Sequence, residues 1–414
     1  MLIIVEKKKI GLLPKLIIGI ICGIVIGLLG ATDIVFLSTV FYIISRIMTT
    51  FSSLFGNFLT YIIPLIIIGF VVPGIADLGS KAGKLLGITV ILAYISTLLA
   101  GTWGWFGATI MMPFIVGAEG VVAENREIYP LFELTIAPIM GVMTALITAF
   151  ILGLGIAAVK GKTLLSVSLE FQDIIKKVIE KVFLPLLPIH IAGIFVQMAF
   201  GGQIASTLGI YGWVFLLTIT LDYVYILFQY FIAFLTTGKR PIRSLRRMFP
   251  AYLTAIGTQS SAATIPVSLK CIKTIDGVDD EIAEFVAPLG ASTHLSGSTI
   301  TLISCAIAVL ALDGISLNFE QTFSFIMLLG VTMVAAPGVP GGAIMAALGL
   351  LETMLGFTEM QMSIMIAIYI AQDSFGTAAN VMGDGALALI VNKFARKDKN
   401  PDQDQPQVVE QKAA

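Results

Sequence analysis

The chain has 414 residues, of which 57% are hydrophobic and 12% are charged, and its mean hydropathy is +0.97. Soluble globular domains carry about 25% charged residues, so the composition excludes that class and predicts an all-α polytopic membrane protein. The net charge of −1 says little about partners beyond the lipid bilayer, and we expect no nucleic-acid partner.

Six apolar runs in the first part of the chain are long enough to span a hydrocarbon core, which takes about 20 helical residues. In chain order they lie near 10–31, 37–77, 83–117, 129–159, 178–201 and 206–236. The first run is too long for the core of a cleavable signal peptide, and no small-residue cleavage site follows it. We therefore expect it to remain as a span.

The rest of the chain holds four apolar segments that polar or helix-breaking residues interrupt. These are 244–272 with GTQSSAATIP, 278–311 with LGASTHLSGST, 320–351 with AAPGVPGGA, and 358–396 with AQDSFGTAANVMGDG. Unwound backbone at membrane depth is tolerated only where protein buries it or where it lines a cavity, and paired broken segments are typical of a transporter's binding site. We predict that 244–272 and 320–351 are re-entrant hairpins, each entering and leaving on one side.

The basic residues support a topology of eight spans and two hairpins. It places these residues at one membrane surface: Lys7–Lys9, Lys15, Lys81, Lys84, Lys160, Lys162, Lys176, Lys177, Lys181, Lys239, Arg240, Arg243, Arg246, Arg247, Lys393, Arg396 and Lys397. Arg126 is the only base that it leaves in the outer loops. Because cytoplasmic loops are rich in Lys and Arg, we expect both termini in the cytoplasm and the protein in a plasma membrane. The polar tail 397–414 is predicted to be a disordered cytoplasmic segment.

The stretch GTQSSAATIP places two hydroxyl groups, those of Ser260 and Ser261, at the tip of the first hairpin. A helix that starts there offers free N–H groups and the positive end of its dipole, which together suit a carboxylate. The alternative is that these small residues only let helices approach closely.

The last segment carries Asp373, Thr377, Asn380 and Asp384 at i, i+4, i+7 and i+11, so they share one helical face, with Gly376 beside it. An acid at mid-membrane costs at least about 2.5–3.5 kcal/mol, so it indicates a functional site. Acid, hydroxyl and amide oxygens suit an ammonium group and a hard cation. A buried network that only fixes helix packing is the alternative.

The chain has two histidines, His190 and His294, and His294 lies in the interrupted segment THLSG. A single buried histidine is more often a satisfied core residue than a functional one, but the interruption makes His294 a candidate ligand. No HExxH, no GxSxG and no phosphate-binding Gly-rich loop with Lys occurs, so we expect neither an enzyme nor a bound cofactor. The Gly-Pro-Gly cluster around Val339 is predicted to be a flexible gate.

Four motifs follow one another along the second half of the chain: TQSSAATIPV, PLGASTHLSG, GVPGGAIM and a last helix ending NVMGD. In this order they resemble the dicarboxylate/amino acid:cation symporters, the glutamate-transporter family, over about residues 10–396. The resemblance implies a homotrimer that works as an elevator. Its static scaffold would be 10–77 and 129–201, its mobile transport domain 83–117 and 206–396, and its extracellular gate the second hairpin.

The resemblance also implies a substrate site, made of Ser260, Ser261, Ser298, Gly338, Val339, Asp373, Gly376, Thr377 and Asn380. Ser261 with the neighbouring backbone, and Asn380, would hold the α-carboxylate of the substrate. Asp373 would hold its α-ammonium group. Gly338 and Val339 would close over it.

Sodium sites are implied in the same way. Asp384 with the Asn380 and Gly290 carbonyl groups would form one site, Ser292 with backbone of the second hairpin a second, and the Ser96–Thr97 hydroxyl pair a third. Where the family has NMDG this chain has HLSG, which replaces the Asn by His294 and the acid by Ser296. The third site thereby loses its charged ligand, so we expect fewer sodium ions per cycle. Proton coupling through His294 is a further hypothesis, because histidine titrates near physiological pH.

Two departures from the family bear on the substrate. Members that carry acidic substrates have an Arg three residues after the ammonium-binding Asp, where this chain has Gly376, and some have an Arg just before the hairpin serines, where it has Gln259. Burying a side-chain carboxylate without a base costs several kcal/mol. The retained Asp373 argues against a plain dicarboxylate, which has no amine.

The sequence therefore predicts sodium-coupled symport of a small neutral amino acid such as serine, threonine or alanine, and AQDS resembles the serine/threonine:sodium branch of the family. The alternatives are a symporter of an acidic amino acid or dicarboxylate, and a proton-coupled or exchange carrier of the same fold. A channel or a membrane structural protein is the alternative from another class.

Overall fold

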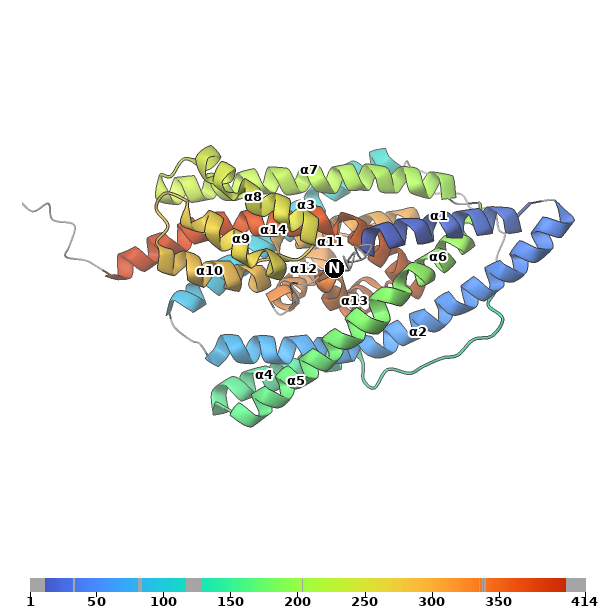
Figure 1. Cartoon of the computed structure of the whole chain (residues 1–414), viewed down its shortest axis with the longest axis horizontal. Coiled ribbons are helices and arrows are strands. Elements are labelled where there is room, and N and C mark those ends of the chain that lie inside the picture. Colours follow the sequence, from blue (N-terminus) through green and yellow to red (C-terminus); the bar gives the residue numbers. More distant parts are fainter. Residues whose placement is uncertain are drawn as a thin grey trace, which may run out of the picture.

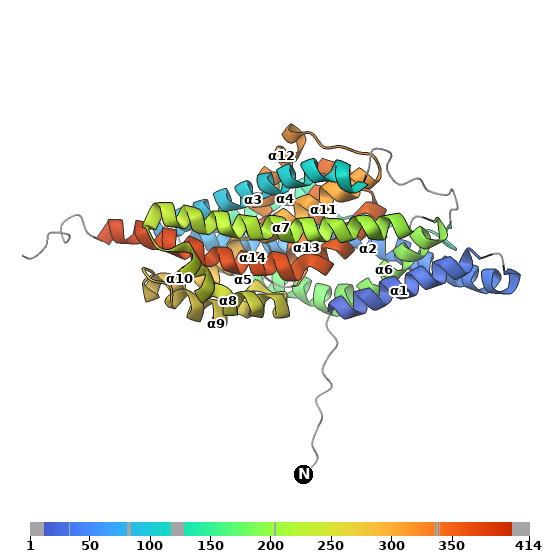
Figure 2. The same ribbon diagram turned by 90° about the horizontal axis from the view of Figure 1, so that it is seen from above.

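The computed structural model describes residues 12–32, 34–80, 84–116, 128–202, 204–334, 336, 338 and 340–399. This described part consists of helices and their connecting segments and contains no strand. The long helices run roughly along one axis of an elongated molecule (Figure 1), and the view from above shows the same arrangement (Figure 2). The prediction of an all-α protein is confirmed.

The first half of the chain forms mostly apolar helices. They are α1 (Leu12–Gly30), α2 (Val35–Ser80), α3 (Lys84–Val116), α4 (Val142–Val159), α5 (Lys162–Val178), the π-helical turn η1 (Ile179–Phe183) and α6 (Leu184–Phe200). α2 has 46 residues and includes Pro64 and Pro73. Proline removes a backbone donor and clashes with the preceding turn, and α2 changes direction part-way along its length (Figure 1).

The second half forms α7 (Ile204–Thr237), then three pairs of shorter helices, then one long helix. The pairs are α8 (Pro241–Thr258) with α9 (Ser261–Lys273), α10 (Asp280–Thr293) with α11 (Ser296–Leu312), and α12 (Phe319–Val334) with α13 (Gly342–Leu355), and the last helix is α14 (Glu359–Lys399). In each pair, the first helix ends and the second begins at or inside the stretch that was predicted from the sequence to interrupt the apolar run. α8 packs against α9 and α12 against α13, as the two predicted hairpins require.

Seven helical runs of the described residues are long and apolar enough to cross a membrane: Val35–Ala76, Leu85–Val116, Val142–Val159, Lys162–Phe200, Leu208–Thr237, Asp280–Leu312 and Glu359–Arg396. Each overlaps one of the predicted spans, although the run Lys162–Phe200 begins well before the predicted 178–201. The remaining predicted span corresponds to α1, whose apolar part, Pro14–Gly30, is shorter. The count of eight spans therefore stays a prediction.

The fourth span is shorter than predicted. It was expected at 129–159, but its helix begins at Val142. Pro130 disfavours helical conformation in the residue before it. Arg46 of α2 donates hydrogen bonds to the Tyr129 and Pro130 carbonyl oxygens, both at 3.2 Å. This side chain satisfies carbonyl groups that a helix would pair internally, and it holds the extended segment against α2.

Two sets of helices pack mainly among themselves: α1, α2, α4, α5 and α6 form one, and α3 with α7–α14 forms the other. Figure 1 shows α2, α4 and α5 along the lower part of the view and α7, α8 and α14 along the upper part. α13 packs against α2 and α4, where a Cβ at Gly349 would overlap Val142. The predicted boundary between scaffold and transport domain runs along this contact of α13 with α2 and α4. The division into these two domains stays a prediction.

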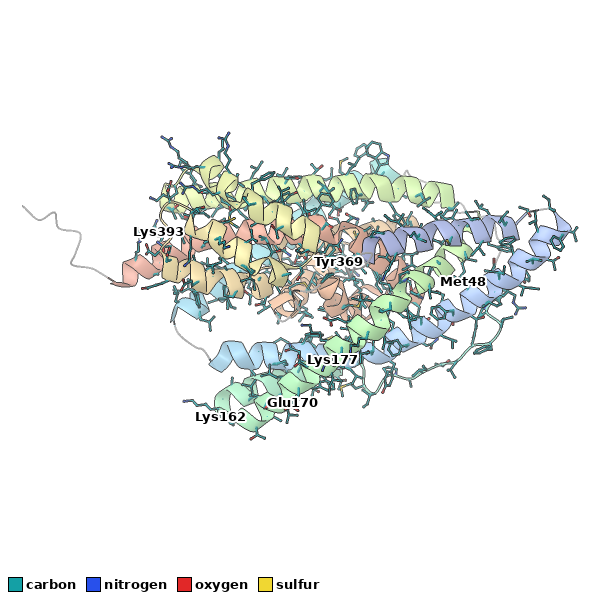
Figure 3. All side chains as sticks on the ribbon, viewed as in Figure 1. Met48, Lys162, Glu170, Lys177, Tyr369 and Lys393 are labelled. Atoms are coloured by element: carbon teal, nitrogen blue, oxygen red, sulfur yellow. The ribbon has the colours of Figure 1, made fainter. Side chains whose placement is uncertain are left out.

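One end of the molecule carries Lys162 and Lys393 (left in Figure 3), two of the bases that the sequence assigns to the cytoplasmic side. Arg247 of α8 donates a hydrogen bond to Asp276, which lies in the connection between α9 and α10. The distance from Arg247 Nη1 to Asp276 Oδ1 is 2.7 Å. This hydrogen bond, assisted by the charges of neighbouring bases, lowers the pKa of Asp276. The first hairpin is thus held at its open end by an ion pair in the α9–α10 connection.

Glycines at intervals of one turn let α1 lie against α6. Gly19, Gly23 and Gly27 face α6, and a Cβ at any of them would overlap a backbone carbonyl oxygen of that helix. Between helices in lipid there is little hydrophobic driving force, so close van der Waals packing through small residues stabilises the contact.

Gly23→Ala is expected to destabilise the protein by about 1–3 kcal/mol, because the added methyl group overlaps the Ala192 carbonyl oxygen and must push α1 away from α6. The free energy of unfolding of the detergent-solubilised protein measures this loss. Gly155→Ala in α4 is the matched control, since a Cβ there meets no atom within 4 Å. Equal stability of the two variants would contradict the close packing of α1 on α6.

Candidate functional site

A contact between the tips of the two hairpins closes one side of the candidate site. α8 ends where Gln259 adopts a left-handed conformation (φ 53°), and Ser260 then caps α9 by accepting the Ala263 N–H at 3.1 Å. The Ser260 hydroxyl donates to the Gly338 carbonyl oxygen at 2.5 Å, and the Ala262 N–H donates to the same oxygen at 3.3 Å. The polar stretch of the first hairpin is therefore a helix N-terminus in contact with the second hairpin.

Asp373 of α14 lies buried beneath the second hairpin, with 4% of its surface exposed. Its Oδ2 accepts the Gly341 N–H at 2.8 Å, and its Oδ1 accepts the Thr377 hydroxyl at 3.3 Å. Gly341 has φ 72°, a left-handed conformation that favours glycine. No Lys or Arg belongs to the buried side chains of the described residues. Asp373 is thus hydrogen-bonded but has no basic partner in the described part of the chain.

Asn380, also on α14, fixes the interruption between α10 and α11. Its Oδ1 accepts the N–H groups of Gly297 at 2.8 Å and Ser298 at 3.1 Å, and its Nδ2 donates to the Ser298 hydroxyl at 2.8 Å. These N–H groups belong to the first turn of α11, where no carbonyl of the helix reaches them. The amide therefore caps α11, and two donors already occupy its oxygen.

Gly376 is where α14 touches α11. A Cβ at Gly376 would lie 3.0 Å from the Thr301 hydroxyl oxygen and 3.4 Å from the Ser298 Cα. On the opposing helix, a Cβ at Gly297 would lie 2.5 Å from the Gly376 carbonyl oxygen. A long side chain at position 376 would have to displace α11, so the space that an arginine needs is filled by a neighbouring helix.

His294, in the interruption between α10 and α11, joins side chains from three other helices. Its Nδ1 lies 3.1 Å from Asp384 Oδ1, and its Nε2 lies 2.9 Å from the Ser96 hydroxyl and 3.3 Å from Gln229 Nε2. Both His294 and Asp384 are 1% exposed. Because a carboxylate only accepts, we assign a proton to Nδ1, and a neutral ring then accepts the Ser96 hydroxyl at Nε2.

The backbone at Gly290 lies against the Asp384 carboxylate. A Cβ at Gly290 would overlap Asp384 Oδ1 and lie 2.7 Å from its Cγ. The Gly290 carbonyl oxygen accepts the His294 N–H at 2.9 Å. Two of the predicted sodium ligands, Gly290 and Asp384, are thus neighbours, and His294 contacts both.

Some of the remaining predicted site residues belong to the network around His294, and others lie outside it. Ser296 accepts the Gln229 amide at 3.2 Å, and Ser261 is buried at the start of α9. The Thr97 hydroxyl instead donates to the Ala93 carbonyl oxygen of its own helix, and the exposed Ser292 donates to the Leu289 carbonyl oxygen. The structure therefore brings Ser96, but not the Thr97 hydroxyl, into contact with His294. Val339 lies outside the described residues.

Two polar side chains of α7 were missed at the level of sequence. Gln229 donates to Ser96 at 3.0 Å and belongs to the network around His294. Asp222 is 3% exposed in the middle of α7. Asp222, Tyr225 and Gln229 recur at i, i+3 and i+7 in an apolar run, which places them on one helical face. That spacing was the signal available in the sequence.

The second histidine, His190 of α6, is a satisfied core residue. Its Nδ1 lies 2.9 Å from the Ser52 hydroxyl of α2, and its Nε2 lies 2.8 Å from the Ser363 hydroxyl of α14. Both ring nitrogens thus have partners, and the ring links three helices of the described part.

A family model described as the sodium:dicarboxylate symporter family matches residues 12–394, a range that includes every site residue above. The chain belongs to this family. The sodium:dicarboxylate symporters are secondary transporters and not enzymes, so this member is a multi-pass membrane protein. The family expected from the four sequence motifs is confirmed.

Several known proteins are similar in sequence to part of this chain. The excitatory amino acid transporter of Caenorhabditis elegans is 32% identical over 167 residues, 40% of this chain and 33% of the relative. Neutral amino acid transporter A of Homo sapiens is 32% identical over 166 residues, 40% of this chain and 31% of the relative. Excitatory amino acid transporter 1 of Mus musculus is 30% identical over 213 residues, 51% of this chain and 39% of the relative. The chain thus spans about a third of the length of these relatives, whose names include both excitatory and neutral amino acid transporters.

Proposed function

We propose that the protein is a secondary transporter that carries a small neutral amino acid across the plasma membrane together with sodium. The observation that carries the proposal is the presence of two complementary groups in one buried site. The α9 N-terminus at Ser260 and Ser261 suits a carboxylate, and Asp373, which lacks a basic partner, suits an ammonium group. An α-amino acid presents both of these groups.

The second hairpin contacts both places where these groups would bind. Its Gly338 carbonyl oxygen accepts from the α9 N-terminus, and its Gly341 N–H donates to Asp373. A bound substrate would replace the first contact with its carboxylate and face Asp373 with its ammonium group. The tip of the second hairpin must then lift to admit the substrate, which is the motion of a gate. Family membership supports the homotrimer, the elevator motion and the cytoplasmic position of both termini, which belong to the same proposal.

A neutral side chain fits the site better than an acidic one. The buried residues of the described part include no Lys or Arg, and α11 fills the space beside Gly376. Gln259 is already engaged, since its amide donates to the Ser374 hydroxyl at 2.8 Å. A substrate carboxylate buried here without a base would cost several kcal/mol. The relatives named neutral amino acid transporters agree with this choice, and an acidic substrate is the alternative that those named excitatory favour.

The coupling ion would bind at Asp384 and the Gly290 carbonyl oxygen. The Gly290 backbone lies against the Asp384 carboxylate, and each of the two oxygens has lone pairs beyond the one that meets His294. The Asn380 oxygen is occupied by two N–H groups, so we assign it to holding α11 rather than to the ion. His294 would then neighbour the cation. Proton coupling in place of sodium is the alternative that His294 favours.

Gly290→Ala is expected to lower the rate of sodium-driven uptake about tenfold, because the methyl group overlaps the Asp384 carboxylate and must displace it from the ligand position. Initial uptake rates in liposomes, taken over a range of sodium concentrations, measure the effect. Gly257→Ala is the matched control: it lies on α8 near the first hairpin tip, and a Cβ there meets no atom within 4 Å. An equal effect of both variants would argue against a sodium site at Gly290.

The proposal is tested by uptake into liposomes that contain the purified protein. Labelled serine, alanine, threonine, aspartate and glutamate are offered with an inward sodium gradient and, separately, with an inward proton gradient. Sodium-driven, saturable uptake of the neutral amino acids without aspartate is the expected result.

The other outcomes each overturn a part of the proposal. Aspartate uptake would show that the absence of a buried base does not decide the substrate. Uptake driven by protons alone would replace sodium as the coupling ion. Flux that neither saturates nor follows a gradient would indicate a channel.

A further inference from the structure

A second intramembrane acid, Asp222, lies outside the site described above. It stands at the middle of the span Leu208–Thr237, about 20 Å from each end at 1.5 Å per helical residue. Its short side chain cannot reach either membrane surface, and 3% of the residue is exposed. Any group that compensates the charge of this acid must therefore lie inside the protein.

The described residues supply no such partner. Neither Oδ1 nor Oδ2 of Asp222 has a hydrogen bond. The small pocket beside it is lined by Ile219, Asp222, Tyr223, Ile226, Tyr252 and Phe375, and it has no room for a water molecule. The carboxyl group is thus dry as well as unpaired. A sodium ion, which needs several oxygen ligands, has neither the space nor the ligands here.

The titratable groups around Asp222 are tyrosine and cysteine side chains. Tyr223 and Tyr252 line the pocket, and Cys305 of α11 is the next group within electrostatic range. The Tyr223 and Tyr252 hydroxyls bond to each other at 2.5 Å, so they are engaged and join α7 to α8. No Lys, Arg or His faces the acid in the described part. An ionised Asp222 would have nothing to compensate its charge.

Asp222 is close to the candidate site. Tyr252 belongs to the first hairpin, and Phe375 lies on α14 between Ser374 and Gly376 and two residues from Asp373. The first hairpin and α14, which carry the groups proposed to bind the substrate, therefore also contribute walls to the pocket beside Asp222. Separation of the first hairpin from α7 at the Tyr223–Tyr252 bond would uncover the carboxyl group.

We propose that Asp222 is a proton-binding site, which holds one proton in this closed arrangement and releases it when the contact between α7 and the first hairpin opens. One O–H bond forms on a carboxylate oxygen with a proton taken from water on one side of the membrane. The same bond breaks when the proton passes to water on the other side, and no electron is transferred. This proposal rests on the proposed transport function, to which it adds a proton that crosses with each substrate.

Transport provides the first test. In liposomes with a trapped pH indicator, the wild-type protein is expected to move protons inward with the amino acid. Asp222→Asn keeps the shape of the side chain but cannot bind and release a proton, so amino acid uptake should continue without proton influx and without dependence on external pH. Asp280→Asn, an exposed side chain in the first turn of α10, is the matched control and should behave as the wild type. Proton influx that persists in Asp222→Asn, or that the wild type lacks during uptake, overturns the proposal.

Infrared spectroscopy tests the bound proton without transport. The purified wild type at neutral pH is expected to show the carbonyl-stretch band of a protonated carboxylic acid. Asp222→Asn should remove the part of this band that comes from Asp222, and Asp280→Asn should keep it. Identical bands in all three proteins would overturn the proposal even if transport were never observed. A wild type that takes up no amino acid but shows the Asp222 band would instead contradict the transport function and leave the proton site standing.

Discussion

Asp373→Asn is expected to raise the serine concentration for half-maximal uptake about 100-fold or more. The amide of asparagine has the same shape as the carboxyl group and can still accept the Gly341 N–H. It cannot compensate the charge of an ammonium group, and removing one partner of a buried charge pair costs about 3–5 kcal/mol. At about 1.4 kcal/mol per factor of ten, this loss corresponds to two to three orders of magnitude in affinity.

Initial rates of serine uptake in liposomes, measured over a wide range of serine concentrations, give the half-saturating value. Asp280→Asn is the matched control, because the Asp280 side chain is 73% exposed in the first turn of α10 and contacts Lys273 only at 3.6 Å. Gel filtration of both variants checks that they fold. If Asp373→Asn kept the half-saturating concentration of the wild type, the ammonium group would have to bind elsewhere, and the argument for an amino acid substrate would fail.

The interruptions of the helices could be predicted from the sequence because they depend on local chemistry. Gln259 and Ser260 stand where small polar residues break an apolar run, and His294 stands where the next run is broken. Backbone that cannot continue a helix in lipid must be buried or line a cavity. The shared face of Asp373, Thr377, Asn380 and Asp384 follows from helical periodicity in the same way.

The partners of these residues could not be predicted, because they depend on how separate helices meet. The sequence predicts that Asn380 binds ligands, and only tertiary packing shows that its side-chain amide also holds the first turn of α11. Thr97 was paired with Ser96, but in a helix adjacent side chains point in different directions, and its hydroxyl bonds to Ala93. Asp222 was overlooked because its run is otherwise apolar, although an acid in such a run is itself a signal. Only tertiary packing shows that it lacks a partner.

Asp384→Asn is expected to abolish the sodium dependence of uptake and to lower the rate about 100-fold or more. The amide oxygen can still coordinate a cation, but it carries no charge, and the described surroundings contain no other acid in contact with His294. The change also leaves the buried His294 ring without its carboxylate partner. Uptake of labelled serine with and without a sodium gradient measures both effects.

A double-mutant cycle with His294→Asn separates the two roles of Asp384. If the acid acts with the imidazole as one unit, the two single substitutions will not add, and the coupling energy will be about 0.5–3 kcal/mol. Ser324→Ala is the control, because this exposed hydroxyl of α12 bonds to the Glu320 carbonyl oxygen of its own helix and should leave the sodium dependence unchanged. Additive effects of Asp384→Asn and His294→Asn would mean that the imidazole only neighbours the acid. Loss of sodium dependence in Ser324→Ala as well would mean that the effect of Asp384→Asn is not specific to the Asp384–His294 pair.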